Sequence, residues 1–176
     1  MTEAYARRVR RRKRLLKCLW YGLMLLGSFL LLTDPHVTFF GCKPNLLVPL
    51  CVMLAVFEGE YVGAMVGAGA GLLMDMALGT LVGIHGVAML LLMFLCGLAV
   101  RGLLRPVLPN CVFLTAVSAL LLTLLHFSLR YWLPGYEGCL SVFLRVFLPN
   151  FVATTAFALV FFWPVRAVER RLRFEV

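Results

Sequence analysis

The chain has 176 residues, of which 62% are hydrophobic and 14% are charged, and its formal net charge is +9. Soluble domains are roughly half apolar and a quarter charged, so this composition excludes an ordinary soluble domain and predicts an all-α polytopic membrane protein. A transmembrane helix needs about 20 apolar residues, and the length therefore allows one bundle of about six helices rather than two domains.

The chain begins with a basic segment that leads directly into an apolar one. Such a segment before a first span predicts a cytoplasmic arm that contacts anionic lipid headgroups, whereas an arm that binds nucleic acid is the less favoured alternative. We expect a basic arm at 1–17, a transmembrane domain at 18–163 and a basic cytoplasmic tail at 164–176. The basic residues of the arm are Arg7, Arg8, Arg10, Arg11, Arg12, Lys13, Arg14 and Lys17.

Six apolar segments follow in chain order. The first, 18–33, is not followed by a small-residue cleavage site, so we expect a retained helix rather than a signal peptide. The second, 46–57, has only 12 strongly apolar residues, which is short for a span, and a re-entrant segment is its alternative. The other four are expected at 61–78, 84–100, 108–129 and 140–163, the last ending at Pro164 because proline removes a helical hydrogen bond.

The distribution of basic residues predicts how these segments cross the membrane. Fourteen of the seventeen lysines and arginines fall into the arm, the tail and a pair at Arg101 and Arg105. Because basic residues concentrate on the cytoplasmic side of membrane proteins, we expect these three groups on that side. This arrangement requires an even number of crossings, so it favours a bundle of six transmembrane helices with both termini in the cytoplasm.

Small residues recur with a spacing of four along the middle of the chain. On a helix this spacing produces a stripe of small residues into which another helix packs closely. We therefore expect this glycine ladder to be a helix-packing or partner-binding surface. Its members are Gly59, Gly63, Gly67, Gly71, Asp75, Gly79 and Gly83.

Asp75 is the only acidic residue well inside an expected span, and an ionisable group there must face the bundle or a wet crevice. It is either a contact for a partner or a proton, or a buried cap bonded to His85 or to the turn at 79–83. His126 and Arg145 are candidates to join Asp75 in a polar cluster in the outer half of the bundle, although a lone histidine on an apolar helix is more often structural.

The sequence offers little other chemistry. It contains no nucleophile elbow, zinc-protease motif or phosphate-binding loop, so we expect no enzyme, no cofactor and no metal. Cys42 and Cys139 fall in expected outer loops, and a disulfide between them is left open.

The segment GLLMDMALGTLVGIHG at 71–86 carries a resemblance to a known family. Together with the proline-led apolar segment at 44–57, it resembles the MreD family of bacterial rod-shape-determining membrane proteins, whose motif matches Gly71, Leu72, Asp75, Gly79 and Gly83. The resemblance implies a non-enzymatic scaffold of the cell-elongation machinery in the bacterial inner membrane, involved in cell shape and peptidoglycan synthesis. The implied partners are a single-span MreC protein and, directly or indirectly, cytoskeletal MreB and the wall-synthesising glycosyltransferase and transpeptidase.

The family fold is similar to the substrate-binding subunits of energy-coupling-factor vitamin transporters, and this similarity supplies a rival hypothesis. A transporter subunit needs an outward pocket with convergent polar and aromatic groups. The expected outer loops offer only His36, Lys43, Arg130, Tyr131, Trp132, Tyr136 and Glu137. The scaffold is therefore favoured, and an unrelated small membrane protein is the third alternative.

Overall fold

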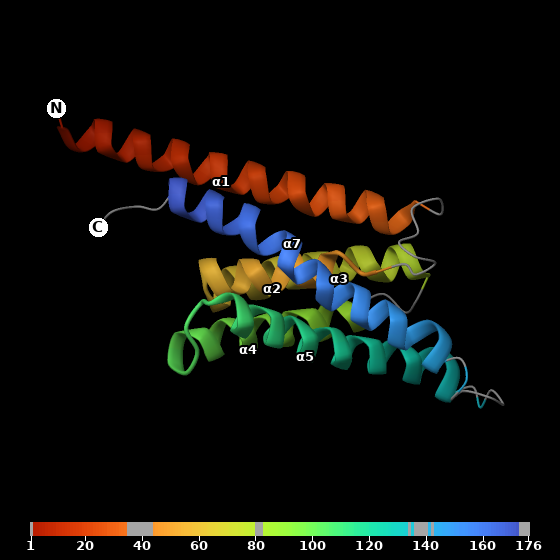
Figure 1. The fold of residues 1–176 in the computed structure, drawn as a ribbon. Coiled ribbons are helices and arrows are strands. Elements are labelled where there is room, and N and C mark those ends of the chain that lie inside the picture. The colour runs from red at the N-terminus through yellow and green to blue at the C-terminus, as the bar shows by residue number, and fades with distance from the viewer. Residues whose placement is uncertain are drawn as a thin grey trace.

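The computed structural model describes residues 2–34, 44–79, 83–133, 135, 141 and 143–172, without the side chains of 2–11, 13, 14 and 172. Every regular element in this part of the chain is helical (Figure 1). The α-helices are α1 (Thr2–Thr33), α2 (Leu47–Glu58), α3 (Glu60–Leu78), α4 (Ile84–Gly102), α5 (Leu108–Phe127) and α7 (Leu148–Leu172), and the π-helices are η1 (Ser128–Trp132) and η2 (Phe143–Phe147).

Five described helices are long and apolar enough to cross a membrane. Their apolar stretches confirm five of the six expected segments, while α2, with 12 residues, is shorter than a usual span. These stretches are Leu15–Thr33, Glu60–Leu78, Ile84–Gly102, Leu108–Trp132 and Phe143–Arg171. The chain is therefore an all-α, multi-pass membrane protein, and a sixth crossing by α2 stays a prediction.

Two helices extend beyond their expected limits. The backbone of the basic arm is helical and continues without a break into the first span, so that α1 has 32 residues. The expectation that the last helix ends at Pro164 is wrong, because α7 includes this proline and continues to Leu172. Membrane helices tolerate proline where neighbouring groups satisfy the backbone carbonyl that it leaves without a donor.

The short helix α2 is the centre of the bundle. Its residues 47–56 are all buried, and it contacts α1, α3, α4, α5 and α7. Figure 1 shows α2 between α1 on one side and α4 and α5 on the other. A helix that is apolar on every side is a buried helix, and α2 has neighbours on every side although it is too short to span the bilayer unaided.

The glycine ladder is divided among helices and turns. Gly59, Gly79 and Gly83 lie at helix ends, where their φ angles of 98°, 62° and 105° fall in the left-handed region that favours glycine. Only Gly63, Gly67, Gly71 and Asp75 belong to α3. The helical part of the ladder therefore ends at Asp75, and the expected turn at 79–83 accounts for Gly79 and Gly83.

The remaining ladder glycines allow α3 to approach its neighbours closely. A Cβ added at Gly67 would lie 2.6 Å from Met93 Cγ of α4, and one at Gly71 would lie 2.7 Å from Gly86 Cα of the same helix. A Cβ at Gly63 would overlap Ala55 of α2. The backbones of α3 and α4 approach closely at Gly67 and Gly71. These two helices share the most extensive contact of any helix pair among the described elements.

The start of α1 and the end of α7 lie at the same end of the bundle, on the left in Figure 1. At this end Lys17 Nζ lies 2.6 Å from Glu58 Oε1, and Tyr21 donates a hydrogen bond of 2.7 Å to the same oxygen. Arg101 of α4 pairs with Glu60 of α3. These contacts join α1 to α2 and α3 to α4 beside the Gly59 turn.

Candidate functional site

A pocket lies at the opposite end of the bundle, and the length of α2 explains its position. At a rise of 1.5 Å per residue, the 12 residues of α2 span about 18 Å, whereas the 19 residues of α3 and of α4 span about 28 Å. Gly59 alone connects α2 to α3, so these helices are level at the end near the chain termini. The shortfall of α2 therefore falls at the other end, where a cavity of about 260 Å³ opens next to Asn45.

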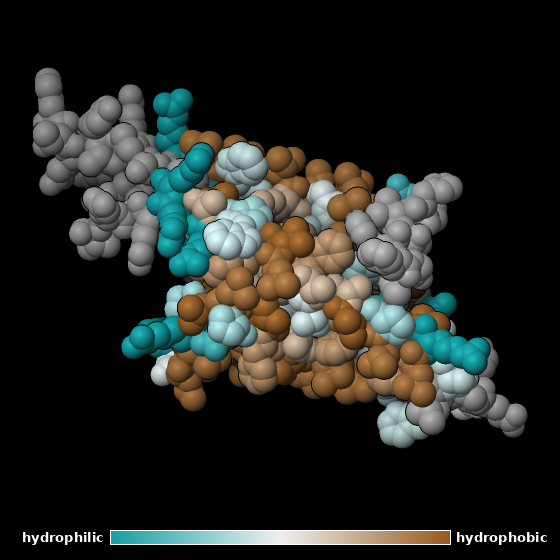
Figure 2. Space-filling model, viewed as in Figure 1, coloured by the Kyte–Doolittle hydropathy of each residue, from teal (hydrophilic) through white to brown (hydrophobic). Residues whose placement is uncertain are grey.

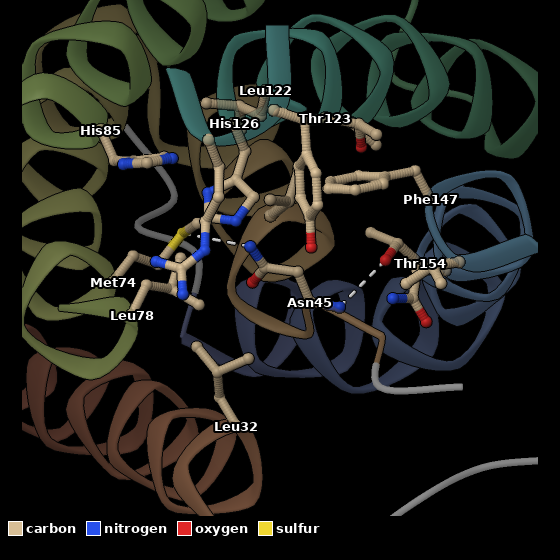
Figure 3. Close-up of a pocket in the computed structure, with 16 residues that line it drawn as sticks. Leu32, Asn45, Met74, Leu78, His85, Leu122, Thr123, His126, Phe147 and Thr154 are labelled. Atoms are coloured by element: carbon tan, nitrogen blue, oxygen red, sulfur yellow. Dashed lines mark hydrogen bonds between the residues drawn. The ribbon is translucent and has the colours of Figure 1, made fainter. Parts of the chain in front are cut away.

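The pocket combines apolar walls with polar groups from several helices (Figure 3). Leu32, Leu78 and Leu122 contribute apolar surface from α1, α3 and α5. The polar residues come from the start of α4, the end of α5 with η1, the start of α7, and the turn before α2. They are Asn45, His85, Thr123, His126, Arg130, Tyr131, Asn150 and Thr154.

Asp75 and His85 form a buried pair, of which His85 lines the pocket and Asp75 does not. Asp75 Oδ2 accepts a hydrogen bond of 2.7 Å from Gly83 N, and Oδ1 accepts one of 3.3 Å from His85 N. His85 Nδ1 lies 2.6 Å from Asp75 Oδ1, and both side chains are fully buried. Of the two roles considered for Asp75, the buried cap is therefore the one that the geometry matches, because it binds the first turn of α4 and orients the His85 ring.

The pair also determines which atom His85 presents to the pocket. Because His85 Nδ1 faces Asp75 Oδ1 at 2.6 Å, Nε2 is the ring nitrogen that remains for other contacts. Within the described part of the protein, His85 Nε2 and His126 Nδ1 are buried and have no hydrogen-bond partner. The two rings are 5.5 Å apart between centroids, so the two nitrogens belong to neighbouring side chains of the pocket lining.

Asn45 fixes the inner end of the pocket. Its backbone N–H donates to Thr154 Oγ1 of α7 at 2.9 Å, and its side-chain amide nitrogen lies 3.1 Å from Met74 Sδ of α3. Asn45 Oδ1 in turn accepts a hydrogen bond of 3.2 Å from Leu47 N at the start of α2. One residue thus connects three helices, which gives the polar end of the cavity a fixed shape.

The expected polar cluster is assembled only in part. His126 lies beside His85, which is bonded to Asp75, whereas Arg145 is exposed and Arg130 lines the pocket instead. Sequence reasoning overlooked Asn45 and Thr154. An asparagine immediately before a wholly apolar helix was the available signal for the first, since asparagine favours helix starts.

The structure describes only some of the side chains predicted for the basic arm and the outer loops. Arg12 is exposed, whereas Lys17 is bound to Glu58. Arg7, Arg8, Arg10, Arg11, Lys13 and Arg14 have side chains outside the described set, and Cys42, Cys139, His36, Lys43, Tyr136 and Glu137 lie outside the described residues. The lipid contacts of the arm and the disulfide therefore stay predictions. No cluster of three or more His, Cys, Asp or Glu side chains that could hold a metal occurs in the part that is described.

The helices and the pocket define a multi-pass α-helical membrane protein with a recessed polar pocket at the end of the bundle remote from its termini. Residues 11–171 match the family model described as rod shape-determining protein MreD. The chain therefore belongs to the MreD family, which confirms the resemblance seen around Asp75. No curated protein and no solved structure matches the chain, so the likeness to energy-coupling-factor subunits stays a prediction.

Proposed function

We propose that this protein is a non-enzymatic scaffold of the rod machinery in the bacterial cytoplasmic membrane. It binds a single-span MreC-like protein and, directly or indirectly, cytoskeletal MreB and the glycosyltransferase and transpeptidase that elongate peptidoglycan. Membership of the MreD family supports this role. The basic residues near both termini support a topology with six crossings and both termini in the cytoplasm. In that topology the pocket opens on the outer side.

The pocket is the surface that we assign to the MreC-like partner. The ladder glycines are less suitable, because Gly63, Gly67 and Gly71 already face α2 and α4 within the chain. Asp75 is fully buried and its carboxylate oxygens already accept hydrogen bonds. A partner that bound these residues directly would have to separate α3 from α4, whereas a partner that enters the pocket leaves the bundle intact.

The single observation that carries this assignment is the pair of buried ring nitrogens without a partner, His85 Nε2 and His126 Nδ1. A buried polar atom without a hydrogen bond costs about 1 to 3 kcal/mol, so a segment that supplies one gains affinity there. The cavity of about 260 Å³ equals the volume of about eight or nine water molecules at ~30 Å³ each. This space suits one or two polar side chains of an extended segment rather than a whole helix.

Two matched substitutions on α5 test the assignment. Thr123→Trp fills the pocket, whereas Leu124→Trp adds the same side chain at the next position, which is 43% exposed and outside the pocket. In a rod-shaped host depleted of its own copy, we expect Leu124→Trp to restore rod shape and Thr123→Trp to leave cells rounded at equal membrane abundance. Co-purification of the MreC-like partner should fall only for Thr123→Trp. Normal shape and partner yield with the filled pocket would refute the assignment.

A further inference from the structure

Two grooves lie beside the last turns of α7, at the end of the bundle opposite the pocket. One has a volume of about 300 Å³ and runs between α1 and α7, where Leu16, Trp20, Met24, Pro164, Ala167 and Val168 form its walls. The other has a volume of about 280 Å³ and is bounded by Trp163, Arg166 and Arg170. Arg171 and Ala167 line both grooves. The Arg171 side chain therefore borders two largely apolar grooves.

The charge of this region is strongly positive. Between Pro164 and Leu172, α7 carries Arg166, Arg170 and Arg171 against the single carboxylate of Glu169. Arg166 Cζ lies 5.2 Å from the centroid of the Phe162 ring, an arrangement that keeps this cation close to the apolar surface. In Figure 2 hydrophilic side chains gather at the end of the molecule where α7 ends, and they border directly on hydrophobic surface. Arginine side chains beside apolar grooves are complementary to a lipid that has an anionic headgroup and long acyl chains.

Two tryptophans place the grooves at the level of the headgroups. Trp20 lines the first groove and is 48% exposed, and Trp163 lines the second and is 68% exposed. Exposed tryptophans in membrane proteins concentrate at the boundary between hydrocarbon and water. Basic pockets between helices bind anionic headgroups near this boundary, and Arg171 lines both grooves.

We propose that α1 and α7 form a specific site for an anionic phospholipid of the cytoplasmic leaflet. Its phosphate binds Arg171, with Arg170 beside it, and its acyl chains occupy the two grooves. The leaflet follows from the proposed topology with cytoplasmic termini, whereas the site itself depends only on the grooves and the arginines. The occupant is a membrane lipid rather than free phosphate, because both grooves beside Arg171 are mainly apolar.

Tryptophan quenching by brominated lipids measures this binding. The full-length Trp132→Phe protein, which retains Trp20 and Trp163, is reconstituted into phosphatidylcholine vesicles that contain an equal mole fraction of brominated phosphatidylglycerol or brominated phosphatidylcholine. We expect stronger quenching by the anionic lipid. One arginine near a membrane surface contributes ~1 kcal/mol, or about fivefold in affinity, so Arg171→Gln should lower the preference about fivefold.

The control is Arg145→Gln, which removes an exposed arginine from η2 and should leave the preference unchanged. Ala167→Leu narrows both grooves without changing the charge, and it should also lower the preference. Added inorganic phosphate should not displace the brominated lipid. Equal quenching by both lipids in the parent protein, an undiminished preference in Arg171→Gln, or displacement by phosphate would each overturn the proposal.

Discussion

Replacing Gly71 with alanine tests the close approach of α3 and α4 most sharply. The added Cβ would lie 2.6 Å from the His85 carbonyl carbon and 2.7 Å from Gly86 Cα. Both obstacles are backbone atoms at the start of α4, so no side-chain rotation removes them. The His85 carbonyl oxygen is nearer still. Ordinary contact begins at 3.4 Å, so the two helices must separate locally by at least about 0.8 Å, which forfeits a quarter to a half of each dispersion contact.

Overpacking of this kind costs about 1 to 3 kcal/mol, and we expect a value near ~3 kcal/mol because backbone must move. For a chain of this size each kcal/mol lowers the melting temperature by about 2 to 4 °C, so Gly71→Ala should melt about 6 to 12 °C lower in detergent. The matched control is Gly69→Ala in the same helix, where an added Cβ meets no atom within 4 Å. The control should melt at or above the parent temperature, since alanine favours helix more than glycine. Equal melting of the two variants would refute the close packing of α3 against α4 at Gly71.

Two further predictions follow from the buried pair and from the topology. Asp75→Leu leaves Gly83 N, His85 N and His85 Nδ1 without their acceptor, at a cost of about 1 to 3 kcal/mol per group. It should therefore reduce membrane abundance and thermal stability, and Asp75→Asn should reduce both by less. An unchanged melting temperature of Asp75→Leu would contradict the role of Asp75 as a buried cap. In a cysteine-free background, an impermeant thiol reagent added outside cells should label Gly135→Cys and not Arg171→Cys, and labelling of both would exclude an even number of crossings.

Apolar segments were predictable because hydropathy is a local property of the chain. The starts of α3, α4 and α5 match expectation within a residue. The end of α7 did not follow from Pro164, because whether a helix continues through proline depends on neighbours that satisfy its backbone. The central position of α2 could also have been predicted from the sequence, since a helix that is apolar on every side has no face that favours contact with water.

The pocket was much harder to predict from the sequence. Asn45, His85 and His126 are separated by 40 residues or more along the chain, and only the packing of α2, α4 and α5 brings them to one cavity. The ladder residues serve two purposes, because glycine suits both turns with positive φ, as at Gly59 and Gly79, and close helix contacts, as at Gly71. Periodicity alone does not separate these causes.

Photo-cross-linking from the pocket tests the central claim, that this MreD-family protein binds an MreC-like partner through its polar cavity. Tyr131 lines the pocket, whereas the neighbouring Trp132 does not and is 72% exposed. A photoreactive phenylalanine analogue at Tyr131 approximates the size of the native ring, and the same analogue at Trp132 is the control. Irradiation of growing cells should produce an adduct with the MreC-like partner from Tyr131 and not from Trp132. Adducts of equal yield from both positions, or none from Tyr131 in cells that keep rod shape, would contradict the account.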